Sequence, residues 1–291
     1  SFLATTAAAG ALTGLAAAQT SGRLPVEKGL VYGMLGRQGS NKLRFQMAKD
    51  AGFDCVETNT TEDPRVVEDL AKAAQDTGLR IHGVMNQAHW AYPLSSGDPE
   101  VVKKSIEGMK TSLRNAKTWG ANTVLLVPGV VNPETTYEQA MERSKRHVSE
   151  LLPLAEQLKV IIAIEEVWNK FLLSPIEFVD YVDSFKSPYL QAYFDVGNVQ
   201  LYGYPEHWIR SLGKRMVKVH FKDFRFRNRQ AEFVNLLDGD LNWPAIYDSL
   251  AAVGYKGPIT LEIAGGDLAY LTDVNKRFEA IIKGATVLRR S

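Results

Sequence analysis

The chain has 291 residues, 45% of them hydrophobic and 23% charged, and its 34 basic and 33 acidic side chains leave a net charge of +1. No basic block or stripe stands out, which argues against a nucleic-acid backbone as the main partner. The single cysteine, Cys55, excludes an internal disulfide framework and a multi-cysteine metal site. A metal ion, if one is bound, must therefore be held by oxygen and imidazole ligands.

The N-terminal segment differs in composition from the rest of the chain. Residues 2–18 are apolar, small and uncharged, and the polar sequence QTSGR comes directly after them. This pattern is typical of the hydrophobic and cleavage regions of an export signal, and the Ser-Phe-Leu start resembles the residues after the paired arginines of a twin-arginine signal. We expect residues 1–22 to be an export-signal remnant or N-terminal extension, and the protein to act in the periplasm or elsewhere outside the cytoplasm. The alternative is an Ala-rich first helix in a cytoplasmic protein; the run is too short for a convincing membrane span.

From residue 29 onward, short β-branched runs alternate with amphipathic helical stretches. The runs predict strands at residues 29–35, 54–59, 80–86, 122–129, 160–167, 191–198, 216–223 and 258–264. Helical periodicity is clear at residues 64–77, 99–119 and 136–158, and several helices run into the next strand through a glycine, as is common at helix C-termini. Such units, with continuous apolar strands, imply a parallel sheet covered by helices.

The number of strand–helix units selects the architecture. Eight units in roughly 250 residues match a closed barrel better than an open doubly wound sheet. No Gly-x-Gly-x-x-Gly follows a strand, so a nucleotide-binding sheet lacks its main signal. No linker rich in Pro, Gly or Ser appears after Arg23. We predict an α/β fold, a (β/α)8 TIM barrel that forms a single domain over residues 29–291.

Residues capable of chemistry stand at the ends of five predicted strands. The active site of a (β/α)8 barrel is built at the C-terminal ends of its strands. The residues there are Glu57, the pair Glu165–Glu166, Asp195, His220 and Glu262. A carboxylate in a hydrophobic run is costly unless it is paired or bound to a cation, and one divalent ion would offset several such costs at once. We therefore predict one divalent metal ion held by Glu165, Asp195, His220 and Glu262, with Mn²⁺ first and Mg²⁺, Co²⁺ or Zn²⁺ as alternatives.

Side-chain alternation separates the two adjacent glutamates without choosing between them. Neighbours in a strand point to opposite faces, so only one of Glu165 and Glu166 faces into the barrel as a ligand. For any single member of the predicted ligand set, a buried polar residue satisfied by a hydrogen bond is a sufficient explanation. For the four together, the metal site is the better interpretation.

The strand ends and their flanks resemble the sugar isomerase/epimerase superfamily, the xylose-isomerase-like barrels that include hexulose-6-phosphate isomerase-like proteins and ketose 3-epimerases. The resemblance covers nearly the whole chain after Gly29 and is strongest over IEEVWNKFLLSP, SPYLQAYFDVGNVQLYGYPEHWI, KVHFKDF and LLDGDLNWPAIYDSL…GYKGPITLEI. It implies the same four metal ligands, which favours Glu165 over Glu166. It also implies a divalent-metal-dependent isomerase or epimerase in which Glu165 and Glu262 are the catalytic acid–base pair. The expected reaction moves a proton through an enediolate on a ketose or related sugar.

Two positions depart from the family pattern. The ketose 3-epimerases commonly have a histidine three residues after the metal-binding aspartate, where this chain has Asn198. They also have an arginine shortly after the metal-binding histidine, a position that Arg225 and Arg227 straddle. The phosphopentulose epimerases resemble the chain more closely at Asn198, yet an exported enzyme would rarely meet a sugar phosphate. The sugar and its phosphorylation therefore stay open.

Further residues are candidates for contact with the sugar. The predicted substrate-binding set is Glu57, His89, Asn198, Lys222 and Arg225. Glu57 is alternatively a buried structural partner, and His89 an ordinary loop histidine. Trp168 and Asn169 form either a sugar-stacking wall or ordinary aromatic packing. We expect structural roles for His82, His147 and His207 and an inert, buried thiol at Cys55.

Three other functions fit parts of the pattern. A lyase or hydrolase of a keto-glycoside would use the same metal and glutamates for β-elimination, and export would favour it. An abasic-site endonuclease shares this fold but normally needs several metal ions and more histidines than the 5 present. A sugar-binding protein without catalysis is the third. We expect a small-molecule sugar as the partner, no nucleic acid and no membrane span, and the sequence leaves a homo-oligomer open.

Overall fold

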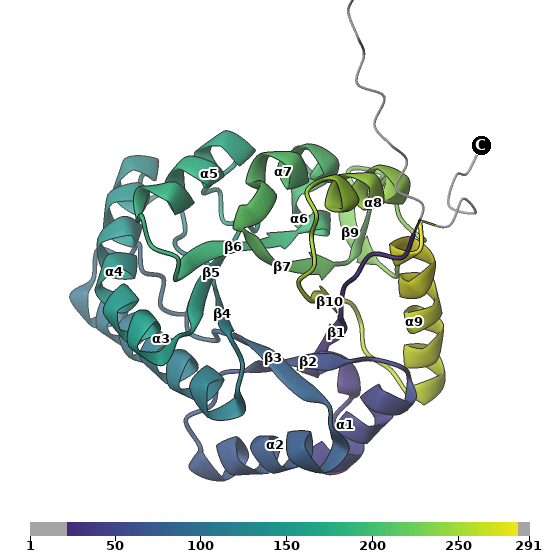
Figure 1. Cartoon of the computed structure of the whole chain (residues 1–291). Helices are drawn as coiled ribbons and strands as arrows, with labels where there is room; N and C mark the ends of the chain where they lie inside the picture. Colours follow the sequence, from purple (N-terminus) through teal and green to yellow (C-terminus); the bar gives the residue numbers. More distant parts are fainter. Residues whose placement is uncertain (1–21, 285–291) are drawn as a thin grey trace, which may run out of the picture.

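Eight parallel strands close into a barrel in the computed structural model, which describes residues 22–284 (Figure 1). The order around the barrel is β1-β10-β7-β6-β5-β4-β3-β2, and β2 pairs with β1 to close it. The strands are β1 (Lys28–Val31), β2 (Cys55–Asn59), β3 (Arg80–Met85), β4 (Thr123–Leu126), β5 (Ile161–Glu165), β6 (Leu190–Asp195), β7 (Met216–Phe221) and β10 (Ile259–Leu261). The predicted (β/α)8 architecture is confirmed. The predicted export segment, residues 1–22, lies outside the described residues except for Gly22.

Helices surround the barrel and bury their apolar faces against it (Figure 1). They are α1 (Asn41–Asp50), α2 (Pro64–Thr77), α3 (Pro99–Trp119), α4 (Tyr137–Leu158), α5 (Pro175–Ser184), α6 (Val196–Val199), α7 (Pro205–Leu212), α8 (Trp243–Ala252) and α9 (Leu268–Ile282), with 3-10 turns η1 (Tyr32–Leu35) and η2 (Gly213–Arg215). The predictions at 64–77 and 99–119 are confirmed at both ends. The helix predicted at 136–158 begins one residue later, because Thr136 and Gln139 form a reciprocal capping box at its start. No helix between residues 22 and 284 is long and apolar enough to cross a bilayer.

All the predicted strands except β2 end earlier than the sequence suggests, and two of them show the structural reason. The first stops at Val31 and continues as the turn η1. The sixth stops at Asp195, whose Oδ1 accepts hydrogen bonds from the backbone N–H groups of Gly197 (2.8 Å) and Asn198 (2.9 Å) and so starts the short helix α6. One of the predicted metal ligands therefore also fixes the backbone beyond its own strand.

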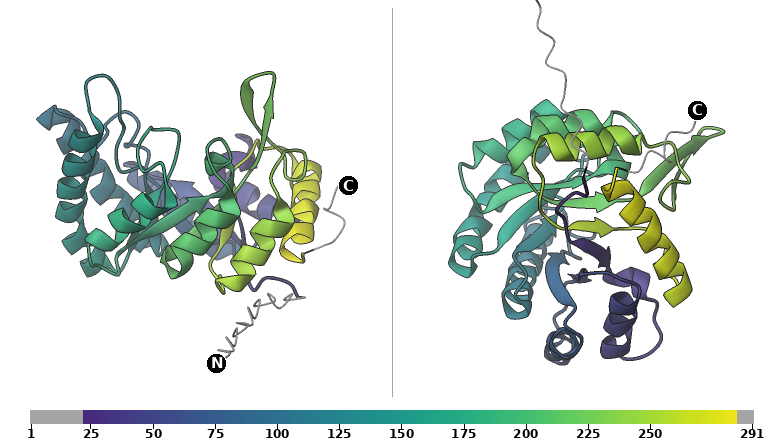
Figure 2. Two further views of the ribbon diagram at one scale, coloured as in Figure 1. Left: turned by 90° about the horizontal axis from the view of Figure 1, so that it is seen from above. Right: turned by 45° about the vertical axis from the view of Figure 1, so that its right-hand side comes forward.

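A two-stranded antiparallel hairpin follows β7 and was not predicted from the sequence. Its strands are β8 (Asp223–Arg227) and β9 (Gln230–Val234). The two turn residues, Asn228 and Arg229, both have positive φ (51° and 63°), as a tight hairpin turn of this length requires. Because β8 begins two residues after β7 ends, the hairpin rises from the end of the barrel where the strands finish, and Figure 2 shows it standing well beyond the barrel.

Polar side chains fill the barrel interior below this end. His82, fully buried, contacts Thr260 Oγ1 through Nε2 at 2.9 Å, and its carbonyl accepts a hydrogen bond from Lys218 Nζ at 3.2 Å. Burial, followed by the nearby Lys218 ammonium, lowers the pKa of His82 well below its ordinary value, so the ring is neutral. These contacts give His82 the structural surroundings that its place in the strand predicts.

Candidate metal centre

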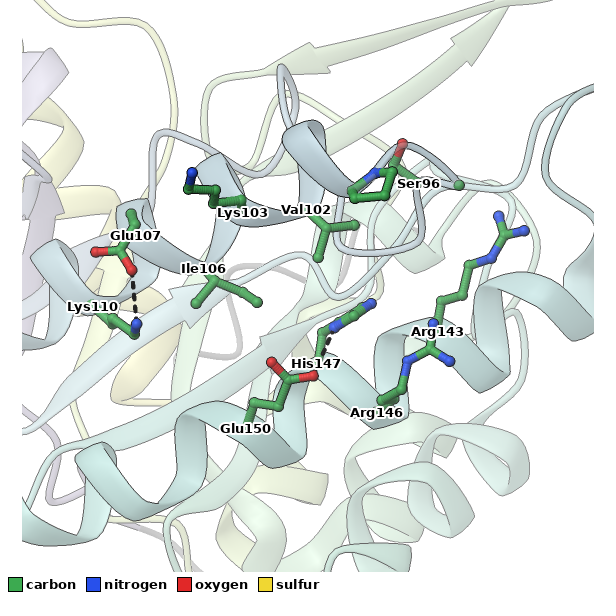
Figure 3. A pocket seen from close by; sticks show the side chains of 12 residues that line it. Ser96, Val102, Lys103, Ile106, Glu107, Lys110, Arg143, Arg146, His147 and Glu150 are labelled. Atoms are coloured by element: carbon green, nitrogen blue, oxygen red, sulfur yellow. Dashed lines mark hydrogen bonds and ion pairs between the residues drawn. The ribbon is translucent and has the colours of Figure 1, made fainter.

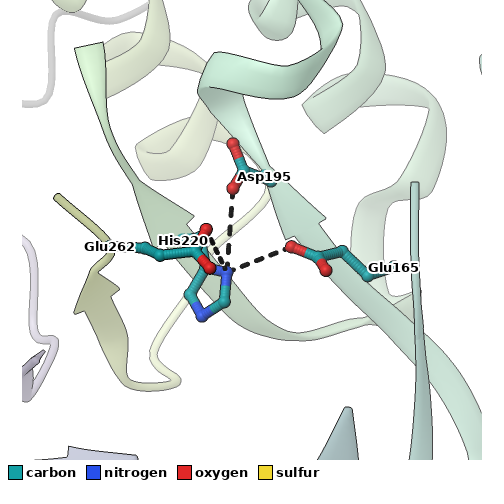
Figure 4. Close-up of side chains that lie close together, drawn as sticks. All are labelled: Glu165, Asp195, His220 and Glu262. Atoms are coloured by element: carbon teal, nitrogen blue, oxygen red, sulfur yellow. Dashed lines mark hydrogen bonds and ion pairs between the residues drawn. The ribbon is translucent and has the colours of Figure 1, made fainter. Parts of the chain in front are cut away.

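Four side chains from neighbouring strands meet at the C-terminal end of the barrel (Figure 4). Glu165 and Asp195 are the last residues of β5 and β6, His220 lies in β7, and Glu262 follows β10 directly. Asp195 and His220 are paired in register, and β10 lies on the other side of β7. One ligand atom from each side chain lies within 4.8 Å of the others. The structure thus brings together the four residues predicted as ligands, which we call the quartet.

The spacing of the quartet fits one divalent ion. His220 Nδ1 lies 3.1 Å from Glu165 Oε1, 3.5 Å from Glu262 Oε2 and 3.7 Å from Asp195 Oδ2. Divalent ions hold nitrogen and oxygen at about 2.0–2.2 Å, so adjacent ligand atoms around one ion lie about 3–3.5 Å apart. Asp195 Oδ2 is buried without a hydrogen bond of good geometry, although it forms an ion pair. Three carboxylates and one imidazole are a hard, oxygen-rich donor set, and the residues therefore fit a divalent metal ion.

Glu57 fixes the orientation of His220. Its Oε2 lies 2.8 Å from His220 Nε2 and accepts a hydrogen bond from the Tyr193 hydroxyl at 3.0 Å. With Nε2–H donating to Glu57, the Nδ1 lone pair faces the three carboxylates, which is the arrangement found for metal-binding histidines. The sequence predicts that Glu57 either contacts a sugar hydroxyl or is a buried structural partner. The side chain is only 1% exposed, and its contacts with His220 and Tyr193 are those of a buried structural partner.

The charged side chains of the quartet change one another's pKa values. Burial raises the pKa of Glu165 to about 7, against the lowering effect of His220. Burial acts in the same direction on Asp195, but the Lys222 ammonium and His220 bring the pKa of that carboxyl down to about 2. Burial would lower the pKa of His220, and the surrounding carboxylates, Glu262 first, raise it well above its ordinary value instead. The site therefore attracts positive charge, either as protons or as a cation.

Lys222 points toward two members of the quartet, and its predicted contact with the sugar stays a prediction. Its Nζ lies 2.6 Å from Glu262 Oε2 and 2.9 Å from Asp195 Oδ2. The side chain is 7% exposed, and although burial alone would lower its pKa, Asp195 and Glu262 raise it. Lys222 is thus a fixed positive charge beside two of the predicted ligands.

Three other predicted substrate contacts are turned to other partners. The Asn198 side chain donates to the Glu166 carbonyl at 2.9 Å, and Arg225 pairs with Glu232 across the hairpin at 2.6 Å. His89 is 4% exposed, and burial lowers its pKa to about 4. Its ring packs edge-on against Trp90, which is 56% exposed. None of these three side chains contacts the quartet within residues 22–284, and their predicted contacts with a sugar stay predictions.

The structure separates the two adjacent glutamates as side-chain alternation requires. Glu165 joins the quartet, whereas Glu166 Oε1 accepts a hydrogen bond from the backbone N–H of Asp195 at 2.7 Å. Glu166 is 1% exposed and its Oε2 has no hydrogen-bond partner. Burial, together with the negative charges of Asp195 and Glu165, raises its pKa well above the ordinary value. Glu166 therefore supports the backbone at the end of β6.

A second hollow lies on the outer surface between α3 and α4 (Figure 3). It has a volume of about 450 Å³ and a strongly charged lining. Two pairs of its lining side chains contact each other: Lys110 pairs with Glu107 at 2.7 Å, and His147 Nδ1 lies 3.0 Å from Glu150. Within the described part of the chain, the quartet is the only cluster of acidic and histidine side chains with metal-site spacing. The end of the barrel is therefore the candidate functional site.

Comparison with known proteins identifies the family of the chain. A family model described as a xylose isomerase-like TIM barrel matches residues 45–290. The chain belongs to this family. The L-ribulose-5-phosphate 3-epimerase UlaE of Escherichia coli O1:K1 is 26% identical over 234 residues, which cover 76% of this chain and 81% of that protein.

Solved structures share the fold of this xylose isomerase-like chain. A D-tagatose 3-epimerase-like protein superimposes with a TM-score of 0.77 at 17% identity, covering 88% of this chain and 98% of the other. The IolI protein with a bound zinc atom gives a TM-score of 0.72 at 17% identity, with the same coverage of 88% and 98%. The resemblance to the sugar isomerase/epimerase superfamily is thus confirmed.

Two features near the site were not predicted from the sequence. The hairpin has a readable signal in DFRFRNRQAEFV, where apolar and charged residues alternate around an Asn that suits the turn. The contact between Glu57 and His220 has no local signal, because β2 and β7 lie across the barrel from each other rather than side by side.

Proposed function

We propose that this chain is a divalent-metal-dependent sugar epimerase or isomerase that transfers a proton on a ketose or related sugar. The observation that carries the proposal is the placement of two carboxylates on opposite sides of the quartet. Glu165 and Glu262 lie at the ends of strands separated by β6 and β7, and Figure 4 shows them flanking Asp195 and His220. Membership of a family with an epimerase relative supports this interpretation.

The chain's own groups provide an acid–base pair and a fixed positive charge. When bound, a divalent ion would polarise the sugar carbonyl and its neighbouring hydroxyl and acidify the C–H between them. Glu165 takes the proton from one face of that carbon, and Glu262 delivers a proton from the other. The Glu262 side chain is 29% exposed and that of Glu165 only 7%, so Glu262 exchanges its proton with water more readily. The Lys222 ammonium, beside Glu262, stabilises the negative charge that develops on the sugar oxygen.

The carbon to which the proton returns decides between epimerisation and isomerisation. Return to the same carbon from the opposite face inverts that carbon, whereas return to the neighbouring carbon interconverts ketose and aldose. We propose epimerisation first, because the two carboxylates flank the site rather than lying side by side. We propose Mn²⁺ as the ion, on the strength of the oxygen-rich donor set.

A panel of free and 5-phosphorylated ketoses, incubated with the Mn²⁺-loaded protein, tests this function. Epimer formation should fall by about a thousandfold in Glu262→Gln, since the acid–base group is lost while the shape is kept. The matched control is Glu232→Gln, which removes an exposed carboxylate of the hairpin that pairs with Arg225. Turnover by Glu262→Gln at the rate of the unmodified protein would contradict the proposed role.

Elimination from a keto-glycoside is a second candidate for the same carboxylate pair. It is favoured by exposed aromatic rings on the hairpin next to the quartet, among them Phe226 and Phe233. In this reaction, loss of the proton expels the group attached through oxygen to the next carbon. A released aglycone, detected by chromatography, distinguishes elimination from epimerisation, which leaves the glycoside intact.

We also propose that residues 1–22 direct export. The support is the uncharged, small and apolar composition of residues 2–18 followed by a polar segment. Fractionation of bacterial cells that express the chain with its natural N-terminus should place it in the periplasm, and deletion of residues 1–22 should retain it in the cytoplasm. The same location for both forms would contradict the proposal.

A further inference from the structure

The β8–β9 hairpin has one aromatic face and one charged face. Phe224 and Phe233 are a cross-strand pair, and Phe226 follows Phe224 by two residues, so the three share a face. The opposite face carries the ion pair between Arg225 and Glu232. Phe224 is 2% exposed, but Phe233 is 41% and Phe226 48% exposed. Two rings of the aromatic face are therefore open to solvent.

Trp168, in the loop after β5, extends this aromatic face toward the quartet. Its indole stacks on the Phe233 ring with centroids 4.9 Å apart and an interplanar angle of 27°, and it meets Phe224 edge-on at 6.2 Å. The indole N–H donates to the Asn198 carbonyl at 2.9 Å, which fixes the ring while leaving the residue 42% exposed. The backbone N–H of Asn198 in turn donates to Asp195 Oδ1. Asn198 thus connects the stack of Trp168 and Phe233 to Asp195, one of the predicted ligands.

Lys222 joins the aromatic face to the quartet. Its Nζ lies 4.5 Å from the centre of the Phe233 ring and 2.6 Å from Glu262 Oε2. One side chain therefore contacts both the carboxylate that we assign to proton transfer and the exposed aromatic ring. If a sugar binds at the quartet, a group attached to it on the side of Lys222 lies next to the aromatic face.

We propose that Trp168, Phe233 and Phe226 form a second binding subsite, which takes a ring linked to the reacting sugar. The ring is a second pyranose or an aryl group in glycosidic linkage, because the flat carbon surfaces of such rings stack on aromatic side chains. The substrate class is then a keto-glycoside, whose reacting sugar keeps a carbonyl away from the glycosidic carbon, rather than a free monosaccharide. The proposal rests on the proposed function for the position of the reacting sugar, at the quartet.

Paired probes test the subsite without turnover. D-glucose, D-galactose and D-xylose are each compared with their phenyl β-glycosides by calorimetric titration of the Mn²⁺-loaded full chain. For at least one pair, the phenyl glycoside should bind tenfold or more tightly than its parent sugar. Phe226→Ala and Trp168→Leu should each bring this affinity ratio down by threefold or more. Gln230→Ala, on the opposite face of the same hairpin, should leave the ratio as it is.

Several results would overturn the subsite. They are a ratio near one for every pair, a ratio that neither Phe226→Ala nor Trp168→Leu lowers, or an equal loss in Gln230→Ala. Phe226 is 48% exposed and has no aromatic-ring partner among the described residues, so its replacement removes no aromatic stacking between the hairpin and the barrel. Sedimentation velocity adds a further arm: a dimer that Phe226→Ala dissociates would show that a second copy of the chain covers the aromatic face.

The two proposals fail separately. Tight, Trp168-dependent binding of phenyl glycosides without any proton exchange on a sugar would remove the proposed function and leave the subsite. Proton exchange on free ketoses, with no preference for a phenyl glycoside over its parent sugar, would remove the subsite and leave the function.

Discussion

Replacing Glu57 with Gln tests how His220 is held for the ion. The two side chains are fully buried, and Glu57 Oε2 lies 2.8 Å from His220 Nε2. Gln keeps the size and can still accept the hydrogen bond, but without the negative charge. A hydrogen bond to a charged group contributes about 1.5–3 kcal/mol, against about 1 kcal/mol for a neutral one. The loss of about 1–2 kcal/mol corresponds to a roughly tenfold weaker affinity for Mn²⁺, within the range of about 10–100-fold observed for such supporting partners.

The assay is calorimetric titration of the metal-free protein with Mn²⁺, with urea unfolding measured in parallel. Tyr193→Phe is the matched control, because it removes the other hydrogen bond to Glu57 Oε2 and leaves the contact with His220 in place. Its Mn²⁺ affinity should stay within about threefold of that of the unmodified protein, since no group that orients the imidazole is lost. An unchanged affinity in Glu57→Gln, or an equal loss in Tyr193→Phe, would refute the assignment of Glu57 to His220.

Three further predictions concern the charges around the site. Because burial raises the pKa of Glu165 to about 7 and the carboxylates raise that of His220, Mn²⁺ binding must displace protons. Its affinity should fall about tenfold per pH unit below 7, and calorimetry in buffers of different ionisation enthalpy should show proton release; a pH-independent affinity would contradict this. Lys222→Met should bind Mn²⁺ more tightly, on the order of tenfold, because the ammonium no longer repels the cation, and it should turn over ketoses more slowly; weaker binding would count against the placement of Lys222. The pKa of Glu166 is raised in the folded protein, so its protonated form stabilises the fold at low pH. This stabilisation is lost as the pH rises toward that pKa. The unfolding free energy of Glu166→Gln, relative to that of the unmodified protein, should therefore rise by about 1–2 kcal/mol between pH 5 and pH 8. A difference that stays constant over this pH range in urea unfolding would exclude the raised pKa of Glu166.

The barrel and the quartet could be predicted because their signals are local in the sequence. Each strand is a continuous β-branched run, and the run that ends at Glu165 or Asp195 shows directly where an apolar strand meets a charged residue. Alternation then predicts that Glu165 and Glu166 point to different faces, which the structure shows.

The side-chain partners could not be predicted, because they depend on contacts made after the barrel closes. Glu57 meets His220 across the barrel, and nothing in the sequence near either residue indicates the other. The sequence predicts substrate contacts for Asn198 and Arg225, whereas in the structure Asn198 donates to the Glu166 carbonyl and Arg225 pairs with Glu232. The second of these contacts exists only because β8 and β9 form a hairpin.

If one metal ion in the quartet enables proton transfer on a sugar, then deuterium exchange must depend on the metal, and a metal titration measures this dependence. Metal-free protein is titrated with Mn²⁺ in D₂O in the presence of a ketose, and deuterium is located in the sugar by NMR. Deuterium should enter at one carbon next to the carbonyl, at a rate that rises with Mn²⁺ up to one equivalent per chain and then levels off. Glu262→Gln should abolish this exchange. Deuterium at no carbon of any ketose in the panel, or the same exchange without Mn²⁺, would contradict metal-dependent proton transfer in the quartet.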